Sequence, residues 1–291
     1  MQVFDLLLKK SYWIQFIFLL FSIVVCASIF LFIAIVVNKI FELEAGTRIF
    51  IYVNQFIITL GIFLVPAFLF SLYNTNKWFA YSHADKTIDF RLVGYVTVLS
   101  LFIIPIIACI GFWNDKIELP GFMHHIEVWM REMEESNKKV LQLLTTHSTF
   151  PVLILNIFVM ALFPALFEEF FFRGTLQPFF SKWFAKKHIA IIVTAFIFST
   201  IHFQFFGFIP RFLLGIYLGY LFLWGKSLWL PVIAHFLHNA LSVIFDYMAQ
   251  QRGIDVEALE PSQLTGFYPF VFLSTIIVLS GIYLAKNKNI I

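Results

Sequence analysis

The sequence predicts an all-α polytopic membrane protein, a helical bundle of about eight transmembrane helices with one amphipathic connector helix. Composition is the first reason: 60% of the 291 residues are hydrophobic, 13% are charged, and the mean hydropathy is +0.88. A soluble domain carries about 25% charged residues. The second reason is that eight separate runs are apolar. Most of them approach the ~20 residues that a helix needs to cross a bilayer.

The apolar runs, taken in order, divide the chain into spans. Gly61 and Pro66 interrupt the second run, which a membrane helix tolerates when its neighbours satisfy the freed backbone groups. We expect the fourth span to continue to a turn near Ala185. The expected spans are residues 12–37, 49–72, 92–112, 150 onward, 189–203, 208–224, 228–245 and 267–285.

The spans are expected to form a single integral membrane domain over residues 1–291. Within the polar part, residues 127–144 are mixed in charge, with apolar residues at steps of three and four. This pattern predicts an amphipathic helix at the membrane interface or over the bundle, and a solvated connector is the alternative. The expected regions are 1–112 with spans one to three, 113–149 as the polar and amphipathic connector, 150–246 with spans four to seven as the catalytic core, and 247–291 with the last span and tail.

Basic residues set the expected orientation. They are more numerous in the segments that share a side with the N-terminus, among them the short basic lead of residues 1–10. We therefore expect both termini in the cytoplasm, and the absence of an Asn-x-Ser/Thr sequon fits a bacterial cytoplasmic membrane. Cys26 and Cys109 lie inside apolar runs, so no structural disulfide is expected. A net charge of +3 without a basic stripe argues against a nucleic-acid partner and leaves membrane lipids as the surroundings.

Three ionisable residues lie close together in the fourth span, where each costs about 2.5 to 3.5 kcal/mol on insertion scales. Glu169 and Arg173 are four residues apart, so they share a helix face and can form a buried pair. Glu168 is rotated by about 100° from Glu169 and is left free for chemistry. The alternative is that all three only lock helices together.

Polar side chains also interrupt two later spans. His235 and Asn239 share a helix face, with His238 close to it, and could donate hydrogen bonds to an oxyanion or serve a metal. His202 ends the fifth span. Glu168 precedes Ala185 by 17 residues and His202 follows it by 17, so both lie at equal height in a hairpin, about 25 Å from its tip. We therefore expect a carboxylate, two imidazoles and an amide to converge within the bilayer. Asn156 and Asp246 are lesser cases near span ends, and Gly215 and Gly219 are expected to form a close helix contact.

Three short motifs follow one another on successive predicted spans. Together they resemble the motifs of the CAAX-processing and bacteriocin-processing (CPBP) proteases, which include the type II CAAX prenyl endopeptidases. The likeness extends over about residues 164–245. The motifs are Glu168-Glu169-x-x-x-Arg173, Phe198-x-x-x-His202 and His235-x-x-x-Asn239.

The resemblance implies an intramembrane endopeptidase with a water-filled cavity, acting on a membrane-associated or lipidated protein or peptide. It also implies a role for each motif residue. Glu168 and His202 would activate a water, and His235 and Asn239 would stabilise the oxyanion. Glu169 and Arg173 would position the activating group. We expect no required cofactor. The alternative is a divalent metal such as zinc, held by Glu168, His202 and His235 with a fourth position open.

Two other functions stay open at this stage. A catalytically silent relative could act as an immunity or scaffold protein in the membrane. Buried carboxylates and histidines also occur along transport and proton-relay paths, although no inverted repeat supports a transporter here. The sequence does not identify the substrate or the oligomeric state.

Overall fold

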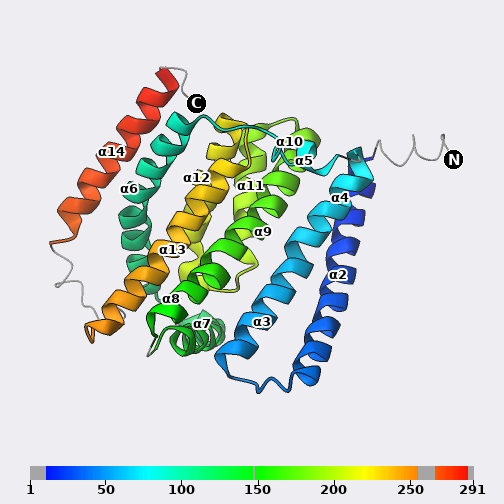
Figure 1. The fold of residues 1–291 in the computed structure, drawn as a ribbon. Helices are drawn as coiled ribbons and strands as arrows, with labels where there is room; N and C mark the ends of the chain where they lie inside the picture. Colours follow the sequence, from blue (N-terminus) through cyan, green and yellow to red (C-terminus); the bar gives the residue numbers. More distant parts are fainter. Residues whose placement is uncertain (1–10, 76, 147, 255–265, 288–291) are drawn as a thin grey trace.

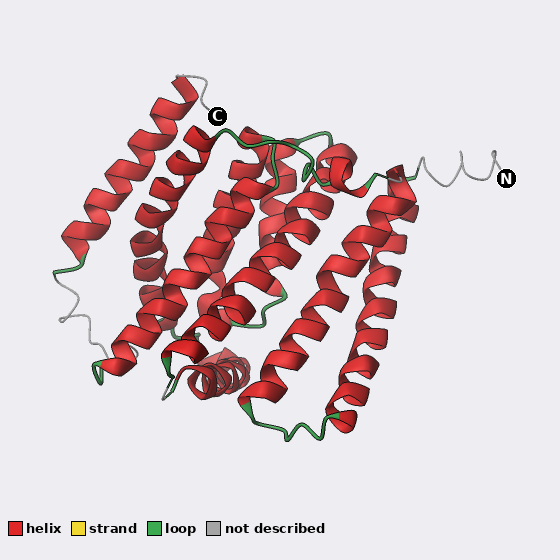
Figure 2. Cartoon of the chain, viewed as in Figure 1, coloured by secondary structure: helices red, strands yellow, loops and turns green. Residues whose placement is uncertain are grey.

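The computed structural model describes residues 11–75, 77–146, 148–254 and 266–287. Within these ranges the regular elements are all helical and no strand occurs, which confirms the all-α bundle (Figure 2). The basic lead of residues 1–10 lies outside the described part. The elements up to the connector are α2 (Tyr12–Ile40), α3 (Arg48–Thr59), η1 (Leu60–Leu64), α4 (Val65–Thr75), α5 (Trp78–Tyr81), α6 (Phe90–Asp115), η2 (Gly121–Met123) and α7 (His124–Thr145). They are followed by α8 (Phe150–Asn156), η3 (Ile157–Leu162), α9 (Phe163–Phe171), η4 (Phe172–Leu176), α10 (Gln177–Phe184), α11 (Lys187–Thr200), η5 (Phe205–Gly207), α12 (Phe208–Gly225), α13 (Trp229–Gln251) and α14 (Tyr268–Asn287).

The long helices stand side by side, and one helix crosses their end (Figure 1). The pair formed by α2 and α3–α4 occupies one edge, α6 and α14 occupy the other, and α9, α11, α12 and α13 lie between them. Helix α7 is seen end-on beneath α8 and packs against α8, α13 and η5. The first described helix begins and the last one ends at the opposite end of the bundle from α7.

Among the described residues, six helices are long and apolar enough to cross a membrane, and two apolar helices are shorter. The fourth span runs from Phe150 to Phe184 and ends at Ala185 in the left-handed conformation, as the sequence predicted. The fifth is a correction to the expected 189–203, because α11 ends at Thr200. The chain turns there, with Phe203 at a φ of 52°, so His202 lies in a turn and not on a helix.

Three π-helical turns have a common cause in the sequence. Each one ends two residues before a proline: η1 before Pro66, η3 before Pro164 and η4 before Pro178. A proline inside a helix has no N–H to donate, and its ring clashes with the carbonyl one turn earlier. A wider turn relieves this clash, as is common inside membrane helices. Two of these turns flank α9, the helix that carries both glutamates.

The connector forms the amphipathic helix that its pattern predicted, placed over the end of the bundle. Its C-terminal end is held by side chains from three other elements. Arg48 donates to the carbonyls of Leu143 and Thr146, Asn156 donates to Leu144 O at 3.0 Å, and Gln250 donates to Thr145 Oγ1 at 2.7 Å. Asn156, one of the lesser polar residues noted in the sequence, therefore fixes α7.

The expected glycine contact joins α12 to α11. A Cβ on Gly215 would lie 3.0 Å from Ala195 Cβ, and one on Gly219 would lie 2.8 Å from Ile191 Cγ2. The carbonyl of Gly215 accepts a hydrogen bond from Arg173, and that of Gly219 accepts one from Gln177. The close approach thus brings α12 within reach of polar side chains on the fourth span. Cys26 and Cys109 are both free thiols, as expected.

Candidate active site

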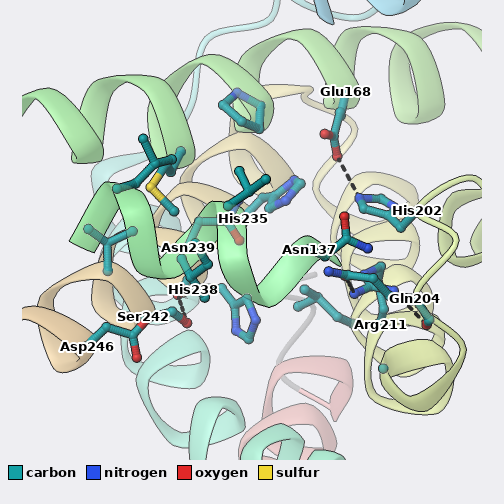
Figure 3. Close-up of a pocket in the computed structure, with 18 of the residues that line it drawn as sticks. Asn137, Glu168, His202, Gln204, Arg211, His235, His238, Asn239, Ser242 and Asp246 are labelled. Carbon is teal, nitrogen blue, oxygen red and sulfur yellow. Dashed lines mark hydrogen bonds and ion pairs between the residues drawn. The ribbon is translucent and has the colours of Figure 1, made fainter. Parts of the chain in front are cut away.

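A cavity of about 640 Å³ lies between α7 and the long helices. Its walls come from α3, η3, α9, the end of α11, the start of α12 and one face of α13, and α7 forms a further wall. The predicted site residues Glu168, His202, His235 and Asn239 all line this cavity (Figure 3). The predicted convergence within the bundle is therefore present in the structure.

Glu168 and His202 point toward each other across the cavity (Figure 3). Their closest atoms, Glu168 Oε2 and His202 Nε2, are 4.0 Å apart. His202 Nδ1 lies 2.7 Å from the carbonyl oxygen of Phe198. Because a carbonyl can only accept, Nδ1 carries the proton, and Nε2 of the neutral ring is left as an acceptor facing the carboxylate. The gap is too wide for a direct hydrogen bond and suits a bridging water.

Glu169 takes part in a different arrangement, together with Arg173 and His235. We call these three residues the buried triad. Arg173 Nη1 lies 2.7 Å from Glu169 Oε1, and both side chains are 0% exposed. The same oxygen lies 2.8 Å from His235 Nδ1, and Arg173 Nη2 donates to Gly215 O at 2.9 Å. The pair expected from the i, i+4 spacing is thus formed, and it ties three helices together.

Phe198 separates the cavity pair from the buried triad. Its ring centroid is 5.1 Å from the ring of His202 and 5.8 Å from that of His235. The guanidinium carbon of Arg173 lies 4.9 Å from the same centroid, a distance that permits a cation–π contact. The first residue of the second motif therefore orients His202 through its carbonyl and covers Arg173 with its ring.

Further polar side chains line the cavity along α13. Asn239 lies one turn after His235, followed by Ser242 and Asp246, in a row that Figure 3 shows running away from Glu168. His238 also lines the cavity, and its Nδ1 has no hydrogen-bond partner among the described residues. This face of α13 therefore adds several polar side chains to the cavity wall.

Several polar residues of the cavity wall, among them the following four, were not identified from the sequence. Glu134 and Asn137 come from α7, Gln204 follows His202 in the turn, and Arg211 lies in the first turn of α12. Burial raises the pKa of Glu134. Arg211 could have been identified from the sequence, because it is the one charged residue in the apolar run 208–224 and a charge inside a membrane span indicates function. The other three had no such signal, since only the packing of α7 and the turn brings them to the cavity.

The side chains proposed for a metal do not form a metal site as they lie. Among the described residues, no three His, Cys, Asp or Glu side chains gather closely enough to hold an ion. Glu168, His202 and His235 are therefore too widely spaced to hold one ion as they lie, although the hydrogen bond at Nδ1 leaves Nε2 of each imidazole free.

Comparison with known families supports the motif-based resemblance. Residues 150–241 match the model of a family described as Type II CAAX prenyl endopeptidase Rce1-like. No match was found among curated proteins or among solved structures. The matched segment contains all three motifs and most of the cavity wall. The similarity to the Rce1-like type II CAAX prenyl endopeptidases therefore covers residues 150–241, the part of the chain that carries the three motifs.

Proposed function

We propose that this membrane protein hydrolyses a peptide bond of a membrane-associated or lipidated protein or peptide, using a water held between Glu168 and His202. The observation that carries the proposal is the placement of these two side chains, whose closest atoms lie 4.0 Å apart in the wall of one cavity. A water between them can donate one proton to the carboxylate and the other toward His202 Nε2.

In the proposed reaction, Glu168 is the general base. The water oxygen forms a bond to the scissile carbonyl carbon as one of its protons passes to the carboxylate. When the C–N bond breaks, that proton is delivered to the departing amine nitrogen, which regenerates Glu168. Such general acid–base catalysis contributes about 10²- to 10⁴-fold in rate.

The buried triad has a separate role in the proposal. Glu169 Oε1 accepts a hydrogen bond from His235 Nδ1 and is itself held by Arg173, so the two residues fix the orientation of the imidazole. Asn239, on the same face of α13, then offers an amide N–H to the oxyanion, and His235 adds Nε2–H when its ring carries both protons. Arg173 and Glu169 are thus positioning residues, because neither lines the cavity.

A Glu168→Gln variant tests this function. Gln keeps the shape of the side chain and removes the base, so we expect cleavage of a lipidated peptide by purified protein to fall by about 10³-fold or more. Thermal unfolding is expected to be unchanged, because the carboxylate has no close partner. Glu135→Gln is the matched control, since Glu135 is an exposed carboxylate on α7.

The same pair of variants separates the enzyme from a silent relative. Unchanged cleavage or an unchanged cellular phenotype in Glu168→Gln would contradict the proposed chemistry and favour an immunity or scaffold role. We propose a metal-free reaction. Its test is activity after exhaustive chelation, together with the metal content of the purified protein, and loss of activity that zinc restores would contradict it.

A further inference from the structure

Three buried polar atoms in and beside the triad have no hydrogen-bond partner among the described residues. They are Nε of Arg173, Oε1 of Gln177 and Oγ1 of Thr194. Their residues are 0%, 4% and 1% exposed, so bulk solvent does not reach them. Leaving a buried polar group unpaired is costly, and proteins almost always satisfy such groups with another protein atom or an ordered water. Three such atoms in one part of the bundle therefore need a common explanation.

Two of these atoms belong to side chains that α12 holds one above the other. Arg173 Nη2 donates to Gly215 O at 2.9 Å, and Gln177 Nε2 donates to Gly219 O at 3.0 Å. The two carbonyls are one turn apart on α12, or about 6 Å along its axis. Each side chain thus uses one polar atom on α12 and has a second one, Arg173 Nε or Gln177 Oε1, beside the same groove.

Thr194 closes this groove from α11, which packs against both α10 and α12 (Figure 1). Ile191 faces α12, because a Cβ on Gly219 would lie 2.8 Å from its Cγ2, and Ala190 belongs to the core cluster shared with phenylalanines of α10. Thr194 follows these two residues by three and four positions, so its side chain points between α10 and α12. The residue after it approaches Gly215, which sets Thr194 at a height between the two glycines.

One water between the three helices would satisfy all three atoms. It can accept from Arg173 Nε–H, donate to Gln177 Oε1 and form a third hydrogen bond with Thr194 Oγ1. Buried waters make about three such bonds. Two hydrogen bonds of about 2.9 Å also span roughly the distance between successive turns of α12. A side chain at Gly219 would intrude here, since its Cβ would lie 3.1 Å from Gln177 Oε1.

We propose that Arg173, Gln177 and Thr194 enclose a binding site for one water, and that Gln177 and Thr194 act through it as positioning residues for the buried triad. The site is separate from the cavity, because none of the three residues lines the cavity. The water fixes the Nε side of a guanidinium that holds Glu169, and Glu169 orients His235. Only the positioning role rests on the proposed function; the water site does not.

A rival explanation is that the three atoms are unpaired in a dry core. The two cases predict opposite effects of Thr194→Val, which keeps the shape of the side chain and removes its hydroxyl. In a dry core the variant loses an unsatisfied polar group and becomes at least as stable as the wild type. At a water site the variant takes a partner from the water and becomes less stable.

Thermal unfolding of the purified full-length protein measures this difference. We expect Thr194→Val to lower Tm by about 2 to 4 °C, the shift for one lost hydrogen bond in a chain of this size. Thr275→Val is the matched control on α14 and should leave Tm nearly unchanged, because the Thr275 hydroxyl bonds within its own helix to Val271 O. A Tm of Thr194→Val equal to or above that of the wild type overturns the water site.

A crystal structure that shows ordered waters is the direct test of the same site. We expect one water within hydrogen-bond distance of Arg173 Nε, Gln177 Oε1 and Thr194 Oγ1. Direct contacts among the three side chains in its place, or no water there, overturn the site. Neither this measurement nor Tm needs a substrate.

The positioning role is tested by peptide cleavage. We expect Thr194→Val to lower kcat by about fivefold, the rate equivalent of one hydrogen bond, with KM nearly unchanged because the residue lies outside the cavity. Gln177→Met should lower kcat at least as much, and Thr194→Ser, which keeps the hydroxyl, should keep most of it. Equal kcat losses in Thr194→Val and Thr194→Ser overturn the positioning role. If the wild type cleaves no peptide, the proposed function fails, and Tm and the crystal structure still decide the water site.

Discussion

Glu168 and Glu169 are adjacent carboxylates on one helix, yet their surroundings differ completely. Glu169 is 0% exposed and shares one oxygen between Arg173 and His235 at 2.7 and 2.8 Å. Glu168 faces a cavity, and the ionisable side chain in closest contact with it among the described residues is His202, at 4.0 Å. A rotation of about 100° along α9 is enough to produce this difference. One carboxylate is fixed by its partners, and the other is left with room for a reactant.

This contrast separates groups that hold the site from groups that react in it. A buried charge with fixed partners is costly to disturb but has no freedom to move a proton. A carboxylate or imidazole at a cavity wall contributes little to stability and can accept a proton during turnover. Variants of the buried triad should therefore lower stability, and variants of the cavity pair should lower activity alone.

The largest expected effect in the buried triad follows from Arg173→Met. Removing the guanidinium leaves Glu169 buried with only His235 beside it, which we expect to destabilise the protein by about 3 to 5 kcal/mol. Unfolding in detergent, followed by tryptophan fluorescence, measures this loss. The double variant Glu169→Met with Arg173→Met should recover much of the stability, because Glu169 Oε2 and Arg173 Nε already have no hydrogen-bond partner among the described residues.

Activity provides the second part of this test. The double variant should stay inactive although it is stable, because His235 has lost the carboxylate that orients it. If the double variant is no more stable than Arg173→Met, the loss of stability in Arg173→Met does not come from the unpaired charge of Glu169. If the double variant cleaves the peptide, Glu169 is not needed to orient His235.

A smaller effect, confined to turnover, is expected from His202→Asn. The Asn amide can replace Nδ1–H in the hydrogen bond to Phe198 O, but it offers no acceptor at the position of Nε2. We expect kcat to fall by about 10²-fold, near the lower end for acid–base groups because Glu168 remains. That corresponds to about 2.7 kcal/mol in the barrier. If His202→Asn lowers the free energy of unfolding as much as Arg173→Met does, His202 has a structural role.

Helix geometry in the sequence was enough to predict the main partner of each glutamate. The pairing of Glu169 with Arg173 follows from helical spacing, and the facing of Glu168 and His202 follows from counting residues on both sides of Ala185. Both are consequences of helix geometry, which is local and regular. The contrast between the two glutamates could therefore be predicted before their partners were known.

What could not be predicted depends on contacts between elements. The bond from His235 to Glu169 requires the placement of α13 against α9, on which the spacing within either helix gives no information. The end of α11 at Thr200 follows from the turn that leads into η5. The cavity wall supplied by α7 depends on capping contacts such as that of Arg48 with Leu143. The π turns had a signal in the prolines that follow them, but proline alone does not distinguish a π turn from a kink.

Glu134 is a third carboxylate, and it gives the comparison its finest test. It lines the cavity from α7, and burial is the main reason that its pKa is raised, although the charge of Arg211 acts in the opposite direction. When the pKa of an acid is higher in the folded state, the protein loses stability as pH rises from the ordinary pKa to the raised value, and the loss persists above it.

Glu134→Gln should therefore remove this decline and slightly stabilise the protein at neutral pH. The side chain is partly exposed and screened by solvent, so we expect less than about 1 kcal/mol, or a rise in Tm of under roughly 4 °C. Thermal unfolding of the wild type and Glu134→Gln between pH 4 and pH 7 measures the difference. If Glu134→Gln is instead less stable than the wild type at neutral pH, the partners of Glu134 stabilise its ionised form, as those of Glu169 do. Lining the cavity would then not distinguish the carboxylates that react from those that hold the structure.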